Sequence, residues 1–163
     1  MKIKRIVRSS LIVTLSIAMA TAAMLLSSPN QAMAVSCSGH SCDGKDPIYT
    51  GCNQNAYLAK RYPIYDTYGI FTGQYTDVYY SRSCGTNWLR VTGNPYGGVA
   101  YKMIQSLNSN GTVHYTEVEK DTGYGSSYSM MVYAPGSTRI EFYGKLFDKS
   151  NKSRAWTGYM TLQ

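Results

Sequence analysis

Three carboxylates alternate along a short segment near the middle of the chain. Glu117, Glu119 and Asp121 would share one face of a β-strand, where residues two apart lie about 7 Å from each other. Glycosidases place paired carboxylates at a comparable separation, but they also need a groove and a carboxylic acid with a raised pKa. The sequence shows neither feature. We therefore expect a solvated strand face with Lys120 nearby, and keep a hydrolase pair as the alternative.

Asp43 and Asp46 flank a Gly-Lys turn and are followed by Pro47. An EF-hand calcium loop needs a twelve-residue frame that ends in Glu, and this segment lacks that frame. Aspartates in such turns usually accept hydrogen bonds from nearby backbone N–H groups. We expect this capping role, with a weak calcium site as the alternative.

Other catalytic chemistry has little support in the sequence. The two histidines, His40 and His114, belong to distant segments. The chain contains no G-x-S-x-G nucleophile motif and no phosphate-binding loop of the type G-x-x-x-x-G-K-[ST]. We therefore predict no catalytic residue, no metal and no cofactor.

Four residues are candidates for binding. Trp88 and Arg90 lie two apart, so a strand would place an indole beside a guanidinium. The alternative is a structural Trp88 that packs beside a disulfide, and we favour it. Tyr96 and Tyr124 lie in Gly-rich turns, where a rigid and amphipathic ring is suited to contact a ligand.

The first 34 residues have the features of an export signal. A cationic start precedes the apolar run 11–26, and Ala32-Met33-Ala34 fits the small-x-small cleavage pattern. The run is shorter than the roughly 20 residues that span a bilayer, which disfavours an uncleaved anchor. A lipoprotein modified at Cys37 is also disfavoured, because it would leave an odd number of cysteines. We expect a signal peptide over 1–34 and one secreted domain over 35–163.

The four cysteines of the exported part are expected to form two disulfides. Their spacing favours Cys37 with Cys42 and Cys52 with Cys84, although the other pairings stay open. A zinc site is disfavoured because the cysteine pairs lack the two-residue spacing of a zinc ribbon.

The elements that must position these residues are mostly strands. Residues 53–62 contain helix formers, an Asn cap and a following Pro63, which predicts a short helix. Beyond Pro63, about seven β-branched and aromatic runs are separated by Gly, Asn and Pro turns. Residues 99–104 and 138–147 alternate with a period of two, which predicts Ile140, Phe142 and Leu146 on one face of the second strand and Tyr143 on the other. We expect a mostly β protein: a small antiparallel barrel or sandwich with a disulfide-stapled N-terminal segment and one short helix.

The cysteine frame resembles a known family. The pattern C-x-G-x-x-C-D-G-x-D-P over 37–47, then Gly51-Cys52, then C-G-x-x-W-x-R over 84–90, is similar to the YjfA-like family of small secreted Gram-positive proteins, a domain of unknown function. The resemblance covers roughly residues 37–92. It implies an extracytoplasmic role and supplies no catalytic residues.

Charge and composition narrow the function. The chain has 16 basic and 9 acidic residues, but four of the cations lie in the expected signal, which leaves no basic run for nucleic acid. All 21 aromatic residues lie after position 34. We expect a non-catalytic module that binds a cell-envelope glycan or another secreted protein, without a stable membrane anchor. A small secreted hydrolase or an enzyme inhibitor is the alternative, and a purely structural envelope protein is a third.

The export signal leads to a first testable prediction. Because a small-x-small site ends at Ala34, the protein recovered from culture medium is expected to begin at Val35. Mass spectrometry of the intact secreted chain measures this directly. A secreted mass that still includes residues 1–34 would contradict the prediction.

Overall fold

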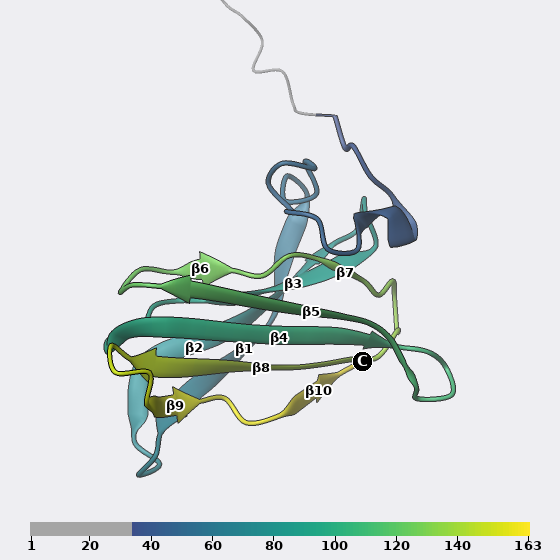
Figure 1. Ribbon diagram of the computed structural model, residues 1–163. Coiled ribbons are helices and arrows are strands. Elements are labelled where there is room, and N and C mark those ends of the chain that lie inside the picture. The colour runs from purple at the N-terminus through teal and green to yellow at the C-terminus, as the bar shows by residue number, and fades with distance from the viewer. Residues whose placement is uncertain (1–33) are drawn as a thin grey trace, which may run out of the picture. The chain divides into compact units, whose positions relative to one another are not determined.

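The computed structural model describes residues 34–163 (Figure 1). The expected signal peptide, apart from Ala34, lies outside the described residues. Within residues 34–163 the only helical element is a 3-10 helix, η1 (Gly39–Cys42). No helix of this part of the chain has the length and apolar character needed to cross a membrane.

The strands form one antiparallel sheet that curls into a nearly closed barrel, which confirms the expected fold class (Figure 1). The order across the sheet is β5-β4-β8-β9-β1-β2-β3-β6, with β10 added to β8 and β7 added to β3. The strands are β1 (Ala56–Asp66), β2 (Phe71–Ser81), β3 (Thr86–Val91), β4 (Gly97–Leu107), β5 (Val113–Thr122), β6 (Ser127–Tyr128), β7 (Val132–Tyr133), β8 (Ile140–Asp148), β9 (Ser153–Trp156) and β10 (Met160–Leu162).

The predicted helix over 53–62 is wrong, because this segment leads into strand β1. β1 continues through Pro63 and pairs with β2 from Ala56 to Tyr65. The register shifts between Leu58 and Lys60 and again between Pro63 and Tyr65, so Pro63 lies beside a bulge, where a strand tolerates proline. Pairing along a long hairpin outweighs the local helix propensity, which is a weak preference.

The barrel interior is filled by alternate residues of the long strands. On β8 the residues Ile140, Phe142 and Leu146 are buried, which confirms the alternation expected from the sequence. On β4 the inward residues are Ala100, Lys102, Ile104 and Ser106. The largest buried cluster joins Ile104, Ile140 and Phe142 to Val78 of β2, Leu89 of β3, Val132 and Ala134, whereas Ala100 and Leu146 belong to a smaller cluster inside the barrel.

Gly144 shows how little free space the interior has. A Cβ atom at Gly144 of β8 would lie 2.2 Å from Thr76 Oγ1 of β2, a distance that no real side chain tolerates. The absence of a side chain at this position lets β8 and β2 approach across the barrel. The interior is therefore tightly packed where β8 and β2 face each other.

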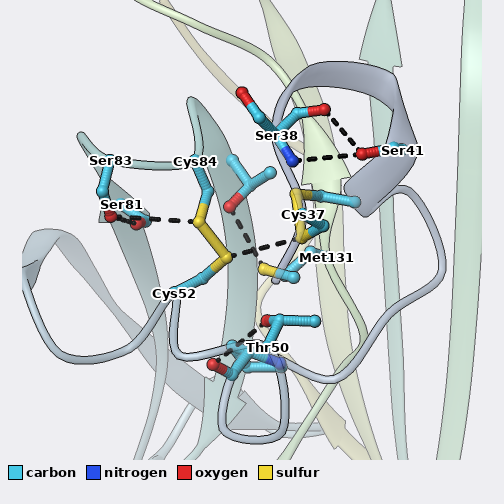
Figure 2. The surroundings of a disulfide bond; sticks show 12 residues. Cys37, Ser38, Ser41, Thr50, Cys52, Ser81, Ser83, Cys84 and Met131 are labelled. Carbon is cyan, nitrogen blue, oxygen red and sulfur yellow. Dashed lines mark hydrogen bonds between the residues drawn. A yellow bond between two sulfur atoms is a disulfide. The ribbon is translucent and has the colours of Figure 1, made fainter. Parts of the chain in front are cut away.

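A second buried cluster lies on the opposite side of β3. Successive side chains of a strand point to opposite faces, so Trp88 lies on the face opposite Leu89. The N-terminal segment covers this face with the disulfides Cys37–Cys42 and Cys52–Cys84, which confirms the favoured pairing (Figure 2). Trp88 is buried among these cysteines and Met131, and its ring stacks on Tyr79 at 5.7 Å.

The two tryptophans of the chain give a matched test of this packing. Trp88 is 3% exposed and Trp156 is 50% exposed. We expect Trp88→Ala to lower the free energy of unfolding by about 3–5 kcal/mol, because it leaves a cavity beside the disulfides. Trp156→Ala is expected to cost much less. Denaturant unfolding of both variants without reducing agent measures the difference, and equal losses would contradict the assignment of Trp88 to the core.

Candidate functional site

The carboxylates of β5 share one face, as the sequence predicted. Tyr115, Glu117, Glu119 and Asp121 are half-buried, whereas the residues between them are exposed. Their partners on β4 include Ile104, opposite Glu117, and Lys102, opposite Glu119. Because directly paired residues point to the same side of a sheet, the carboxylates face the barrel interior from its edge strand.

Lys102 is the buried base next to these carboxylates. Its side chain is fully buried, and Nζ donates hydrogen bonds to Asp121 Oδ2 at 2.7 Å, Ser127 Oγ at 2.8 Å and the Ala100 carbonyl oxygen at 3.2 Å. Burial lowers the pKa of Lys102, and the neighbouring Asp121 opposes part of that shift. Through these contacts with Asp121 of β5 and Ser127 of β6, Lys102 connects the two strands on the inner side of the sheet.

A hollow of about 420 Å³ lies beside β5 and β6, and its lining includes Asp46, Glu119, Asp121 and residues 122, 123 and 125–128. Asp121 is engaged with Lys102, and Glu117 Oε2 accepts a hydrogen bond from the Tyr115 hydroxyl at 3.1 Å. Asp46 Oδ1 accepts hydrogen bonds from the backbone N–H groups of Ile48 and Tyr49, which is the capping role expected for it. Two of the three β5 carboxylates are therefore held by neighbouring side chains.

The structure brings together the two histidines that the sequence separates by 74 positions. His40 Nδ1 lies 2.9 Å from His114 Nε2 and 3.2 Å from Asp43 Oδ2. Asp43 thus belongs to a histidine cluster and not to a site with Asp46. Sequence reasoning missed this cluster because nothing local connects η1 to the start of β5.

Trp88 and Arg90 do not form an open site. Trp88 is buried, and the Arg90 guanidinium lies over the Tyr128 ring at 5.8 Å. Hydrogen bonding with the Tyr79 hydroxyl raises the pKa of Arg90, and the nearby Asp77 carboxylate adds to the shift. Asp77 is itself buried and receives two hydrogen bonds from Arg61, at 2.7 and 2.9 Å. The pair thus lies within a structural network.

The structure places the turns that carry Tyr96 and Tyr124 side by side. The Asn94 N–H donates to the Tyr124 carbonyl oxygen at 3.1 Å, and a Cβ atom at Gly97 would overlap the Tyr124 ring. Tyr96 is half-buried and packs against the cluster that contains Ala100. Tyr124 is 61% exposed, with Lys149 Nζ 5.4 Å from its ring. Of these two rings, only that of Tyr124 is therefore largely exposed to solvent.

A larger set of aromatic residues lies on the solvent side of the sheet. The pairing register aligns a row across β1, β9, β8, β4 and β5, namely Tyr65, Trp156, Lys145, Tyr101 and Lys120. All five side chains point away from the core, because Ala155 and Leu146, adjacent to two of them, are buried. This row runs across five adjacent strands.

Two further aromatic rings, those of Tyr143 and Tyr159, extend this row. Tyr101 stacks on Tyr143 at 5.6 Å, and Tyr143 lies 6.0 Å from Tyr159. Burial and the neighbouring Tyr101 raise the pKa of Tyr143 to about 12. We call this surface the aromatic face and define it by Tyr65, Tyr101, Tyr143, Trp156 and Tyr159, with Lys145 between Trp156 and Tyr101 and Lys120 at its β5 end.

Polar side chains border the aromatic face. Gln105 Nε2 donates to Glu141 Oε2 at 2.8 Å and to the Tyr159 hydroxyl oxygen at 2.9 Å. The Tyr159 hydroxyl in turn donates to Glu141 Oε2 at 2.9 Å. The alternation of residue types along each strand predicted that Tyr101 and Tyr143 lie on the faces of their strands opposite the buried residues. It gave no sign that β4, β8, β9 and β1 are neighbours.

The buried ion pair provides a third test. Asp121→Ala leaves the Lys102 ammonium buried without its carboxylate, and we expect a loss of about 1–3 kcal/mol of stability near neutral pH. Without Asp121 the folded-state pKa of Lys102 falls further below its unfolded value, so the deficit shrinks as pH rises and the ammonium loses its proton. Denaturant unfolding across a pH series measures this. Lys102→Met is the control, because an apolar side chain there removes the need for a carboxylate; in that background Asp121→Ala should cost little.

Comparison with known proteins completes the description of the chain. The family described as proteins of unknown function, DUF2690, matches residues 40–142, which include Cys42, Cys52, Cys84 and both histidines. No curated protein and no solved structure matches the chain. Because the match covers more than half of the sequence, this disulfide-stapled β-barrel belongs to the DUF2690 family.

Proposed function

We propose that the protein is an extracellular binding module that holds a cell-envelope glycan on its aromatic face. The observation that supports this proposal is the continuous row of Tyr65, Trp156, Lys145, Tyr101 and Lys120 across five adjacent strands. Tyr65 and Trp156 are 43% and 50% exposed although they are large and partly apolar. An exposed apolar surface of this kind commonly marks a binding site.

The chemistry of the face suits a sugar polymer. Sugar rings present apolar C–H groups, which pack on aromatic rings, and hydroxyl groups, which need hydrogen-bond partners. Tyr101, Tyr143 and Tyr159 supply the rings, and Gln105 and Glu141 supply an amide and a carboxylate at their border. A strand-based platform also keeps the rings in place, so little conformational freedom is lost on binding.

The two lysines of the face add selectivity. Lys120 Nζ lies 5.5 Å from the centre of the Tyr101 ring, and Lys145 Nζ lies 5.3 Å from that of Phe147. An ammonium held over a ring remains available to an anionic group of a bound polymer. Glycans that carry carboxylate or phosphate groups are therefore the preferred ligands in this proposal.

The proposed location follows from the cysteines and the N-terminus together. The two disulfides indicate an oxidising compartment. The export signal over 1–34, and the resemblance to small secreted Gram-positive proteins, extend this to a protein released from the cell and working at its outer surface.

A small hydrolase remains the second candidate function. The hollow beside Glu119 and Asp121 is the observation that favours it, since a hydrolase needs a recess lined by carboxylates. The Asp121–Lys102 ion pair argues against this reading, because it occupies one of the two carboxylates.

The fourth prediction tests the aromatic face. Tyr101→Ala and Trp156→Ala are each expected to weaken retention of the mature protein on purified cell-wall polysaccharide by about 5- to 30-fold, the range for one interface anchor worth 1–2 kcal/mol. The measurement is a depletion isotherm on insoluble wall material, repeated after the wall protein has been removed. Loss of binding after deproteination would point to a protein ligand.

Matched controls distinguish the two candidate surfaces. Tyr49→Ala removes an exposed ring outside the aromatic face and is expected to bind like the parent. Tyr124→Ala and Tyr96→Ala test the Gly-rich turns, and a larger loss there than for Tyr101→Ala would move the site to those turns. Glu119→Gln is expected to leave binding unchanged, whereas glycan release that this change abolishes would support the hydrolase.

A further inference from the structure

We propose that His40, Asp43 and His114 form a site for a divalent transition-metal ion of the zinc class. The three ligand atoms are His40 Nδ1, Asp43 Oδ2 and His114 Nε2, and all lie within 4.8 Å of one another. This proposal is independent of glycan binding, because the cluster includes no residue of the aromatic face.

The spacing of the three atoms fits a tetrahedral ion. Ligand atoms about 2.0–2.1 Å from a tetrahedral zinc ion lie about 3.3–3.4 Å from each other. The distances are 2.9 Å between the two imidazole nitrogens, 3.2 Å from His40 Nδ1 to Asp43 Oδ2, and 3.9 Å from His114 Nε2 to Asp43 Oδ2. The three observed distances lie on either side of the ideal spacing. Small rotations of the two imidazole rings would therefore bring the ligand atoms to that spacing.

Hydrogen bonding satisfies this cluster less well than a metal ion would. His40 Nδ1 offers either one proton or one lone pair, yet it faces both a carboxylate oxygen and an imidazole nitrogen. A single proton on His40 Nδ1 would have to be shared between Asp43 and His114 in a bifurcated bond, and a lone pair that accepts a proton from His114 leaves a carboxylate oxygen opposite it. A metal ion satisfies all three groups at once, because each presents a lone pair to it.

A β-bulge presents His114 to the cluster. Ser106 pairs with Tyr115 and Leu107 pairs with Val113, so His114 is the extra residue of β5. Bulges of this kind turn a side chain out of the regular alternation and often occur next to functional sites.

The stapled segment holds the other two ligands. His40 lies in η1, inside the loop closed by the Cys37–Cys42 disulfide, and its ring also packs edge-on against Tyr133 at 4.4 Å. The backbone N–H of Tyr133 donates to Asp43 Oδ1 and leaves Oδ2 for the cluster. Outer hydrogen bonds that orient a ligating carboxylate in this way are typical of metal sites.

The ligand set selects the class of ion. Two imidazoles and one carboxylate suit zinc and its transition-metal neighbours, whereas calcium and magnesium prefer oxygen ligands alone. A hollow of about 230 Å³ adjoins the cluster and is lined by both histidines, Ser106, Asn108 and Tyr133. It leaves the fourth position of the ion to water or to an outside ligand.

The test uses the mature oxidised protein without a histidine tag, with the absence of free thiols checked by titration. Equilibrium dialysis against zinc is expected to give one ion per chain, and cobalt(II) is expected to give the absorption of a tetrahedral site. Outer hydrogen-bond partners are worth 10- to 100-fold in metal affinity, so loss of a ligand in His40→Ala, His114→Ala or Asp43→Asn should weaken zinc binding by at least about 100-fold. Asp46→Asn is the control and should bind zinc like the parent.

Three results would overturn the proposal. They are no zinc bound at ten times the protein concentration, unchanged binding in all three ligand variants, or binding that appears only after reduction, which would assign the ion to the cysteines. Nitrogen-detected NMR of the parent protein keeps the test valid if a variant fails to fold. The chain has only two histidines. Zinc is expected to move His40 Nδ1 and His114 Nε2 to the shifts of metal-bound nitrogens, and to hold the ring proton on His40 Nε2 and on His114 Nδ1.

Discussion

The two disulfides hold the N-terminal segment against the outer side of β3, and much of the molecule depends on that attachment. Cys52–Cys84 closes a loop across 32 positions, and its constraint on the unfolded chain is worth about 3–4 kcal/mol. It covers Trp88, which would otherwise expose a large indole on the sheet surface. The same attachment brings His40 and Asp43 to the first residues of β5. The burial of Trp88 and the geometry of the histidine cluster therefore both depend on the attachment of the N-terminal segment.

The incomplete closure of the barrel explains its polar edge. A fully closed barrel has no free strand edge, but here β5 is joined to β6 through side chains, with Lys102 reaching Asp121 and Ser127. A buried ammonium is tolerated at this position because a carboxylate, a hydroxyl and a carbonyl oxygen surround it. Of the three β5 carboxylates, Asp121 is the partner of that lysine, and Glu117 is held by the Tyr115 hydroxyl.

The same strands that build the core also build the aromatic face, because side chains alternate between the two sides of a sheet. Ala100, Leu146 and Ala155 fill the interior, while Tyr101, Lys145 and Trp156 follow them on the outside. A stable interior thus supplies a rigid platform for the rings. The aromatic face and the histidine cluster share no residue, so one of them can be altered without loss of the other.

The sequence by itself determined what depends on local pattern. Alternation predicted the strands of residues 99–104 and 138–147, the cysteine spacing favoured the correct disulfides, and a tryptophan beside a cysteine indicated a core position. The tertiary structure decided what depends on pairing between distant segments. Residues 56–62 form a strand because they pair with β2 in a long hairpin. Pairing of β1 with β9 places Tyr65 beside Trp156, and a bulge in β5 places His114 beside His40. Strand order and register arise from contacts between segments far apart in the chain, and a local pattern of residue types does not encode them.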